Sequence, residues 1–149
     1  CDRVEYSNLN RQDYLPDDVG SWKTYAASKR IRSIDPDVEI IAHCVRLEPS
    51  NVVSIFSGCD VVCEALDSAE SKSMLVDALL IGCPGMKVVS GSGMAGLGDP
   101  GLIKTEKRFR NLHVCGDGIS EDSEGFTAAR VCVCAGHMAC AVIDILRTK

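Results

Sequence analysis

The sequence lacks an excess of basic residues and a recognisable N-terminal leader. Lys and Arg number 16 against 21 Asp and Glu, which gives a formal net charge of -5. Nucleic-acid-binding proteins normally carry clustered excess Lys and Arg, so this balance argues against nucleic acid as the main partner. No charged segment leads into an apolar run with a small-residue cleavage site, so no secretory signal is visible and a cytoplasmic location is expected.

The nine cysteines include no Cys-x-x-Cys pair, so structural zinc is not predicted. Cys132, Cys134, His137 and Cys140 fall in one predicted helix, where residues two apart point to nearly opposite sides, so core packing is favoured over a metal site. Most cysteines lie in apolar runs and are expected to be reduced, buried thiols. Cys115 also has apolar neighbours, which disfavours a nucleophilic role.

Each long apolar run in the sequence contains a charged or ionisable residue. The most apolar predicted helix, 127–147, contains Arg130, His137 and Asp144, so a membrane span is not expected. Its many small residues instead suit a tightly packed core helix or a dimer helix. With 149 residues, 46% of them hydrophobic, the chain can bury one core, and a single domain over residues 1–149 is expected.

Strand and helix patterns alternate along the chain. Apolar, β-branched runs typical of buried strands occupy four segments: 38–47, 59–66, 87–93 and 111–115. Helical spacing of apolar residues occupies four others: 21–34, 51–56, 68–83 and 127–147. Apart from the possible strand at 111–115, the region 94–124 is expected to be irregular. The alternation predicts a doubly wound α/β fold with a mostly parallel sheet, whose ligands bind at the carboxyl ends of the strands.

Polar side chains occur where such a site would lie, either after predicted strands or at a helix start. They are Asp2, Asn8, Arg11, Gln12, Lys23 and Asp67. Arg11 offers a fork of donors for phosphate oxygens, Lys23 adds a charge near a helix N-terminus, and Asp67 can hold Mg²⁺. These residue types suit a nucleoside triphosphate site. They suit equally well two solvated surface cations and an acid that caps the next helix.

Five segments resemble the ThiF/MoeB family of ubiquitin-activating-enzyme-like proteins in order and spacing, over nearly the whole chain. They are DRVEYSNLNRQ, DDVGSWK, IDPDVEI, VVCEALDSAESK and GSGMAG. The resemblance implies a Rossmann-like fold in which Asn8 and Arg11 contact the triphosphate of ATP. It also implies that Lys23 stabilises charge on the phosphates, that Asp67 binds Mg²⁺ and that Gln12 supports the site.

The resemblance further implies an activity, the ATP-dependent adenylation of the C-terminal glycine of a ubiquitin-like sulfur carrier protein (ThiS-like or MoaD-like) by a homodimeric enzyme. Zinc-less ThiF-type proteins of thiamine biosynthesis are the most similar. Two alternatives stay open. A tRNA threonylcarbamoyladenosine dehydratase-like enzyme would carry Thr-Asn-x-Asn-Arg-Gln rather than the SNLNRQ of residues 7–12. A non-catalytic scaffold half of an activating enzyme would have lost ATP binding.

The family normally opens with a strand, a Gly-x-Gly-Gly-x-Gly turn, a helix and a second strand, none of which precedes Cys1. The glycines of 91–96 follow a predicted strand but lead into irregular sequence, so they do not fit a phosphate loop. We therefore expect the chain to be a fragment or a processed piece whose first strand-turn-helix is missing. Such a fragment should be less stable than the family domain and inactive by itself.

Overall fold

The computed structural model describes residues 2–148 and divides into two compact units, Cys1–Arg46 and Leu47–Lys149. The first unit contains two 3-10 turns, η1 (Tyr6–Asn8) and η2 (Pro16–Asp18), followed by helix α1 (Lys23–Ile34). Helix α1 confirms the helix predicted over 21–34. It ends at Asp35, whose extended backbone is the conformation favoured before a proline.

The segment 38–47 was predicted to be a strand buried on both faces, and this prediction is wrong. The described sheet has four strands, and this segment is not one of them. Several of its apolar side chains are exposed, with Ile41 at 74% of its full accessibility. Its β-branched composition suits a strand, but propensity acts only where a neighbouring strand supplies pairing and a packing surface. No strand of the described sheet pairs with 38–47, although Leu47 at its end packs against buried core residues.

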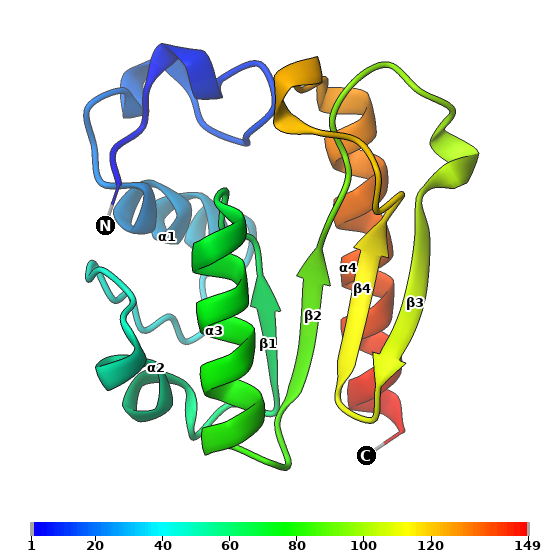
Figure 1. The fold of residues 1–149 in the computed structure, drawn as a ribbon. Coiled ribbons are helices and arrows are strands. Elements are labelled where there is room, and N and C mark those ends of the chain that lie inside the picture. The colour runs from blue at the N-terminus through cyan, green and yellow to red at the C-terminus, as the bar shows by residue number, and fades with distance from the viewer. Residues whose placement is uncertain (1, 149) are drawn as a thin grey trace. The chain divides into compact units, whose positions relative to one another are not determined.

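The second unit is a sheet flanked by helices (Figure 1). Its helices are α2 (Pro49–Phe56), α3 (Ala69–Gly82) and α4 (Ala128–Arg147), and its 3-10 turns are η3 (Pro100–Leu102) and η4 (Asp122–Glu124). Its strands are β1 (Val61–Glu64), β2 (Lys87–Gly91), β3 (Lys104–Phe109) and β4 (Leu112–Gly116). The sheet order is β1-β2-β4-β3, with β1, β2 and β4 parallel and β3 antiparallel to β4. The predicted mostly parallel α/β class is confirmed.

Two local predictions differ from the structure. Helix α2 begins at Pro49, two residues before the predicted 51–56, with Glu48 rather than Ser50 or Asn51 at the N-cap; the Asn51 side chain instead accepts the backbone N–H of Glu48 from within the first turn. Strand β3 lies in the region expected to be irregular. Its sequence KTEKRF is charged and fully exposed, as is common for an edge strand, so it carries no apolar alternation to reveal it.

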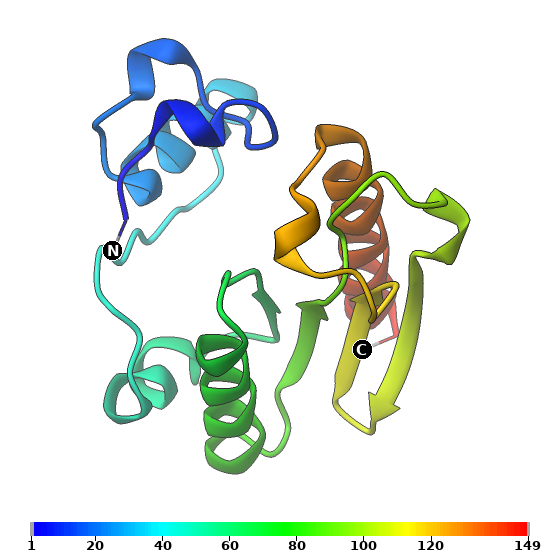
Figure 2. The same cartoon turned by 45° about the horizontal axis from the view of Figure 1, so that its top comes forward.

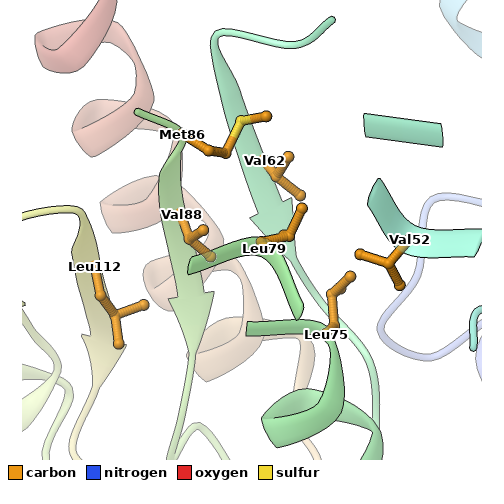
Figure 3. Packing of buried hydrophobic residues seen from close by; sticks show 7 residues of the cluster. All are labelled: Val52, Val62, Leu75, Leu79, Met86, Val88 and Leu112. Atoms are coloured by element: carbon orange, nitrogen blue, oxygen red, sulfur yellow. The ribbon is translucent and has the colours of Figure 1, made fainter. Parts of the chain in front are cut away.

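Helices α3 and α4 cover opposite faces of the sheet, as Figures 1 and 2 show. Alternate strand residues therefore enter two cores. On the α3 face, Val62 and Val88 pack against Leu75 and Leu79 of the helix, in the cluster drawn in Figure 3. On the α4 face, the buried residues are Val89, Ile103, Cys115, Cys134, Met138 and Ala141. Both cores hold the carboxyl ends of β1, β2 and β4 at one edge of the sheet.

Helix α4 packs through one face only. Among residues 2–148 it is the one helix long and apolar enough to cross a membrane, a test that the core helix of a soluble protein also passes. Arg130, Cys134 and Met138 are buried against the sheet, while Ile143 is 56% exposed on the outer side. The helix therefore has one buried face and one exposed face, and small apolar residues occupy much of the exposed face.

The eight cysteines within residues 2–148 are free thiols, but they are not mostly buried as expected. Only Cys115 and Cys134 are buried, whereas Cys59, Cys63, Cys132 and Cys140 are exposed. Cys132 and Cys140 lie on the outer face of α4, which apolar sequence alone could not distinguish from the inner face. Burial raises the pKa of Cys115, and burial together with the neighbouring Cys115 raises the pKa of Cys134 to about 11. Neither thiol is a ready nucleophile at neutral pH.

Candidate functional site

Lys23 and Asp2 form an ion pair at the start of α1. The Lys23 backbone N–H donates to the carbonyl oxygen of Asp2 over 2.9 Å, and its Nζ lies 2.6 Å from Asp2 Oδ2. The hydrogen bond from Lys23 lowers the pKa of the Asp2 carboxyl, even though partial burial opposes this. Lys23 is thus held at the N-terminus of α1 with its side chain 24% exposed, and an anion approaching it would compete with Asp2.

Residues 7–12, between Asp2 and Lys23 in the chain, form a turn that contains Asn8, Arg11 and Gln12. Asn8 is buried, and its Oδ1 accepts the backbone N–H of Glu5 over 3.0 Å, which stabilises η1. Its backbone oxygen accepts the N–H groups of Arg11 and Gln12 at 3.1 and 2.9 Å. Arg11 Nη1 in turn donates to the carbonyl oxygen of Ser7 over 2.8 Å. Asn8 therefore organises the turn, and Arg11 is held against it.

Gln12 lines a shallow cavity in the first unit, between this turn and α1. The cavity has a volume of about 370 Å³, and its lining consists of Gln12, Asp13, Tyr14, Ala27, Arg30 and Ile31. Across its polar side, Arg30 Nε lies 3.0 Å from Asp13 Oδ2. Gln12, the last residue of the turn that holds Arg11, therefore borders this cavity.

Asp67 lies three residues after the end of β1, in the loop between β1 and α3. It is exposed, and its Oδ1 accepts the backbone N–H of Ser68 over 2.9 Å. The cap of α3 is not Asp67 but Ser68, whose hydroxyl accepts the N–H of Ser71 over 3.2 Å. The alternative that Asp67 serves only as the cap of this helix is therefore wrong.

A buried polar network that sequence reasoning missed lies beneath Asp67. Glu64 has no exposed surface, and its carboxylate accepts hydrogen bonds from Lys72 Nζ at 3.1 and 3.2 Å and from Ser90 Oγ at 2.5 Å. The signal was present, because an acid inside the apolar run VVCEAL and a lysine at the first turn of the next helix are both unusual in a core.

A second buried ion pair, also missed, joins Asp117 to Arg130 near the carboxyl ends of β2 and β4. Their side chains are 4% and 5% exposed. Burial opposes ionisation of Asp117, but hydrogen bonds from the Ser120 and Ile119 amides, with the Arg130 charge, lower its pKa overall. The pair lines a cavity of about 170 Å³ and connects two loops, since Arg130 Nη1 also donates to the carbonyl oxygen of Asp99.

The predicted site residues thus fall in both units. Asn8, Arg11, Gln12 and Lys23 belong to the first unit, where they occupy one turn and the adjoining helix start, and Asp67 belongs to the second. Within residues 2–148 no three His, Cys, Asp or Glu side chains converge as a protein metal cage. The donor set at Asp67 nevertheless fits Mg²⁺, which is commonly held by one or two carboxylates together with waters and substrate phosphates.

The model of the ThiF family matches residues 1–149. The chain belongs to the ThiF family. The resemblance found in its sequence motifs is confirmed.

Curated relatives of this ThiF-family chain include proteins named as adenylyltransferases. A sulfur carrier protein adenylyltransferase of Thermus thermophilus is 40% identical over 85 residues, which are 56% of this chain and 31% of the relative. The adenylyltransferase and sulfurtransferase UBA4 of Candida glabrata is 34% identical over 115 residues, 76% of this chain and 25% of the relative. The chain therefore spans less than a third of the length of these relatives.

Solved structures agree on the fold. A tRNA N6-threonylcarbamoyladenosine dehydratase of E. coli in complex with AMP matches with a TM-score of 0.84 and 20% sequence identity, over 99% of this chain and 74% of that one. The same enzyme in complex with ATP matches with a TM-score of 0.81 over 99% and 73%. At this identity the likeness establishes the Rossmann-like architecture of the ThiF-family chain and nothing finer.

Proposed function

We propose that the protein adenylates the C-terminal glycine of a ubiquitin-like sulfur carrier protein of the ThiS or MoaD kind, using ATP and releasing pyrophosphate. The observation that carries the proposal is that a ThiF-family chain retains Arg11, Lys23 and Asp67, two cations and one carboxylate suited to a metal-bound triphosphate. Relatives named as sulfur carrier adenylyltransferases support the same activity. The ATP complex of the E. coli structural relative supports ATP as the nucleotide.

The chemistry explains why these residue types suffice. A terminal carboxylate oxygen of the carrier attacks the α-phosphorus of ATP, the bond from this phosphorus to the bridging oxygen breaks, and pyrophosphate leaves with the electron pair. The product is an acyl adenylate. A carboxylate is already deprotonated at neutral pH, so the step needs no general base. The protein must align the reactants and stabilise the negative charge that builds on the phosphates.

Each proposed role follows from the local geometry. Arg11, whose Nη1 donates to the Ser7 carbonyl oxygen and to Asn10 Oδ1, would present its guanidinium charge to phosphate oxygens, and Asn8 keeps the turn in shape. Lys23 supplies charge at the N-terminus of α1. Asp67 would hold Mg²⁺, which when bound neutralises charge on the phosphate oxygens. Gln12 takes a supporting place beside the turn.

The proposal is tested by carrier-dependent exchange of labelled pyrophosphate into ATP, with the complete natural protein, Mg²⁺ and a ThiS-type carrier. We expect Arg11→Ala to lower the exchange rate on the order of a hundredfold, because one charge-stabilising donor is lost. Arg32→Ala is the matched control, since Arg32 is an exposed arginine of α1 with no proposed role. Thermal melts of both variants would verify that each remains folded.

The same assay separates the alternatives. Full exchange by Arg11→Ala would refute the assignment of the phosphate site. No exchange by the wild-type protein with any carrier would favour a scaffold half of an activating enzyme. ATP turnover that depends on tRNA and not on a carrier would favour a threonylcarbamoyladenosine dehydratase-like enzyme, whose fold this chain shares.

Finer assignments remain predictions within this proposal. The sequence resemblance predicts thiamine biosynthesis as the pathway and a homodimer. The cytoplasmic location is expected because no secretory signal is visible in the sequence. The outer face of α4 supports a dimer, because Ala135, Gly136 and Ala139 are exposed there and small residues allow two helices to approach closely.

A further inference from the structure

The network around Glu64 connects three elements at the carboxyl edge of the sheet. Glu64 ends β1, Ser90 is its register partner on β2, and Lys72 lies in the first turns of α3. Lys72 Nζ also donates to the carbonyl oxygen of Gly91 over 3.0 Å, at the last residue of β2. Figure 1 shows the start of α3 beside the carboxyl ends of both strands. Every polar atom of this network has a partner.

Stability alone does not explain why charged residues occupy this position. Glu64 and Ser90 point to the same face of the sheet as Val62 and Val88, two residues earlier on each strand, and those are core residues of the α3 cluster. Apolar side chains at 64 and 90 would extend that core. A buried ion pair is commonly no more stabilising than well-packed apolar residues of similar volume. The network is better explained by what it holds in place.

It holds the loop that carries Asp67. Glu64 Oε1 accepts the backbone N–H of Leu66 over 2.5 Å, which fixes the chain one residue before Asp67. On the other side, Asp67 itself accepts the N–H of Ser68, the cap of α3. The backbone between the end of β1 and the start of α3 is therefore constrained at both ends, with the Asp67 side chain at the exposed tip.

We propose that Glu64 and Ser90 are positioning residues that hold Asp67 in the orientation needed to bind Mg²⁺, while Lys72 neutralises the buried charge of Glu64. This rests on the proposed function, in which Asp67 is the metal-binding carboxylate. Glu64 acts through its hydrogen bond to Leu66, and Ser90 holds Glu64 in place. The charge of Lys72 is engaged by Glu64, so Lys72 itself is not a phosphate ligand.

Two double variants that differ only at residue 64 isolate the hydrogen bond to Leu66. Glu64→Ala with Lys72→Met removes both charges, so no unpaired charge is buried, and it also removes the acceptor for Leu66. Glu64→Gln with Lys72→Met removes the same charges but keeps an amide oxygen for Leu66 and an amide N–H that can donate to Ser90 Oγ. The second variant is the conservative rescue of the first.

The first readout is the Mg²⁺ concentration that gives half the maximal pyrophosphate exchange in the complete protein. We expect the alanine pair to raise it about 10–100-fold, the usual effect of losing a group that orients a metal ligand. The glutamine pair should stay within about twofold of wild type, because it retains the orienting hydrogen bond. A purely structural role would lower the melting temperature without shifting this Mg²⁺ dependence.

The second readout needs neither metal nor activity. Hydrogen–deuterium exchange of the backbone amides of 65–68, measured without Mg²⁺, should be faster in the alanine pair and near wild type in the glutamine pair. Glu106→Gln, which breaks the exposed pair with Arg108 on β3, should change neither readout. If the alanine pair does not fold, Ser90→Ala removes one hydrogen bond without changing charge and should raise the Mg²⁺ requirement roughly 2–10-fold.

The outcomes separate this inference from the proposed function. Wild-type Mg²⁺ dependence and amide exchange in a folded alanine pair, or in Ser90→Ala where the pair does not fold, would overturn the positioning role. If Asp67→Asn is inactive in the same assay, the proposed function survives that result. If Asp67→Asn exchanges pyrophosphate like wild type, Asp67 is not the metal ligand, and the proposal for the site fails together with the inference.

Discussion

Breaking the ion pair between Asp117 and Arg130 should be among the most destabilising single changes in the second unit. Asp117 Oδ1 accepts the N–H groups of Ile119 and Ser120 at 2.9 Å, while Oδ2 accepts from Arg130. Both side chains are almost completely buried. Asp117→Ala would leave the Arg130 guanidinium buried with its charge uncompensated and only the Asp99 carbonyl oxygen as a partner among the hydrogen bonds described above.

The magnitude follows from that uncompensated charge. Removing one partner of a buried ion pair costs about 3–5 kcal/mol, because the remaining ion has lost water and gained nothing in exchange. Domains of this size have an unfolding free energy of about 5–15 kcal/mol, so the loss is a large fraction of the total. Because the pKa of Asp117 is lowered, its carboxylate is ionised at pH 7, and the unfolding free energy should be measured at this pH.

The assay is urea unfolding followed by circular dichroism, for wild type, Asp117→Ala, Arg130→Met and the double variant. A shift in the midpoint at unchanged slope reports the loss of stability. The double variant should cost less than the sum of the two single variants, because it buries no unpaired charge. A cost below about 1 kcal/mol for both single variants would refute the reasoning, since it would mean that the pair is solvated or dispensable.

Two further predictions concern the core and the pH dependence of stability. Leu79→Ala should lower the unfolding free energy by about 2–5 kcal/mol, because Leu79 is fully buried in the cluster of Figure 3. Ile81→Ala, at an 80% exposed position of the same helix, should lower it by less than about 0.5 kcal/mol. Equal losses for the two variants in urea unfolding would contradict this prediction. Burial, with repulsion from Lys107 and Lys87, lowers the pKa of His113 below its ordinary value of 6.5. The unfolded chain therefore takes up a proton that the folded chain does not as pH falls through 6.5, so stability should decrease from pH 7.5 to 5.5, and His113→Asn should remove that part of the slope. An identical slope in wild type and variant would rule out His113 as its source.

Much of the fold could be predicted because its signals are local. Helices α1, α3 and α4 follow from apolar spacing over consecutive turns, and Ser68 and Thr127 cap two of them within three residues along the chain. Strands β1, β2 and β4 were recognised from short apolar runs. Strand β3 was not recognised, because an exposed edge strand has no buried face that requires apolar residues.

The candidate site was predictable in part for the same reason. SNLNRQ, Lys23 and Asp67 were recognised from order and spacing, and the structure adds how each is held. What sequence reasoning missed are the partners. Glu64 and Ser90 are 26 residues apart, and Asp117 and Arg130 are 13 apart, so no local pattern connects them.

The sequence by itself determined the family, the alternation of strands and helices, and the residues of the proposed phosphate and metal groups, because these are properties of short stretches and their spacing. Tertiary structure decided that the apolar segment 38–47 is not a strand and that the charged KTEKRF is one. It also decided that a buried acid pairs with a partly buried lysine close to Asp67. Each of these depends on which distant segment is adjacent in space. Sheet pairing and buried ion pairs are set by such neighbours and not by the residues alone.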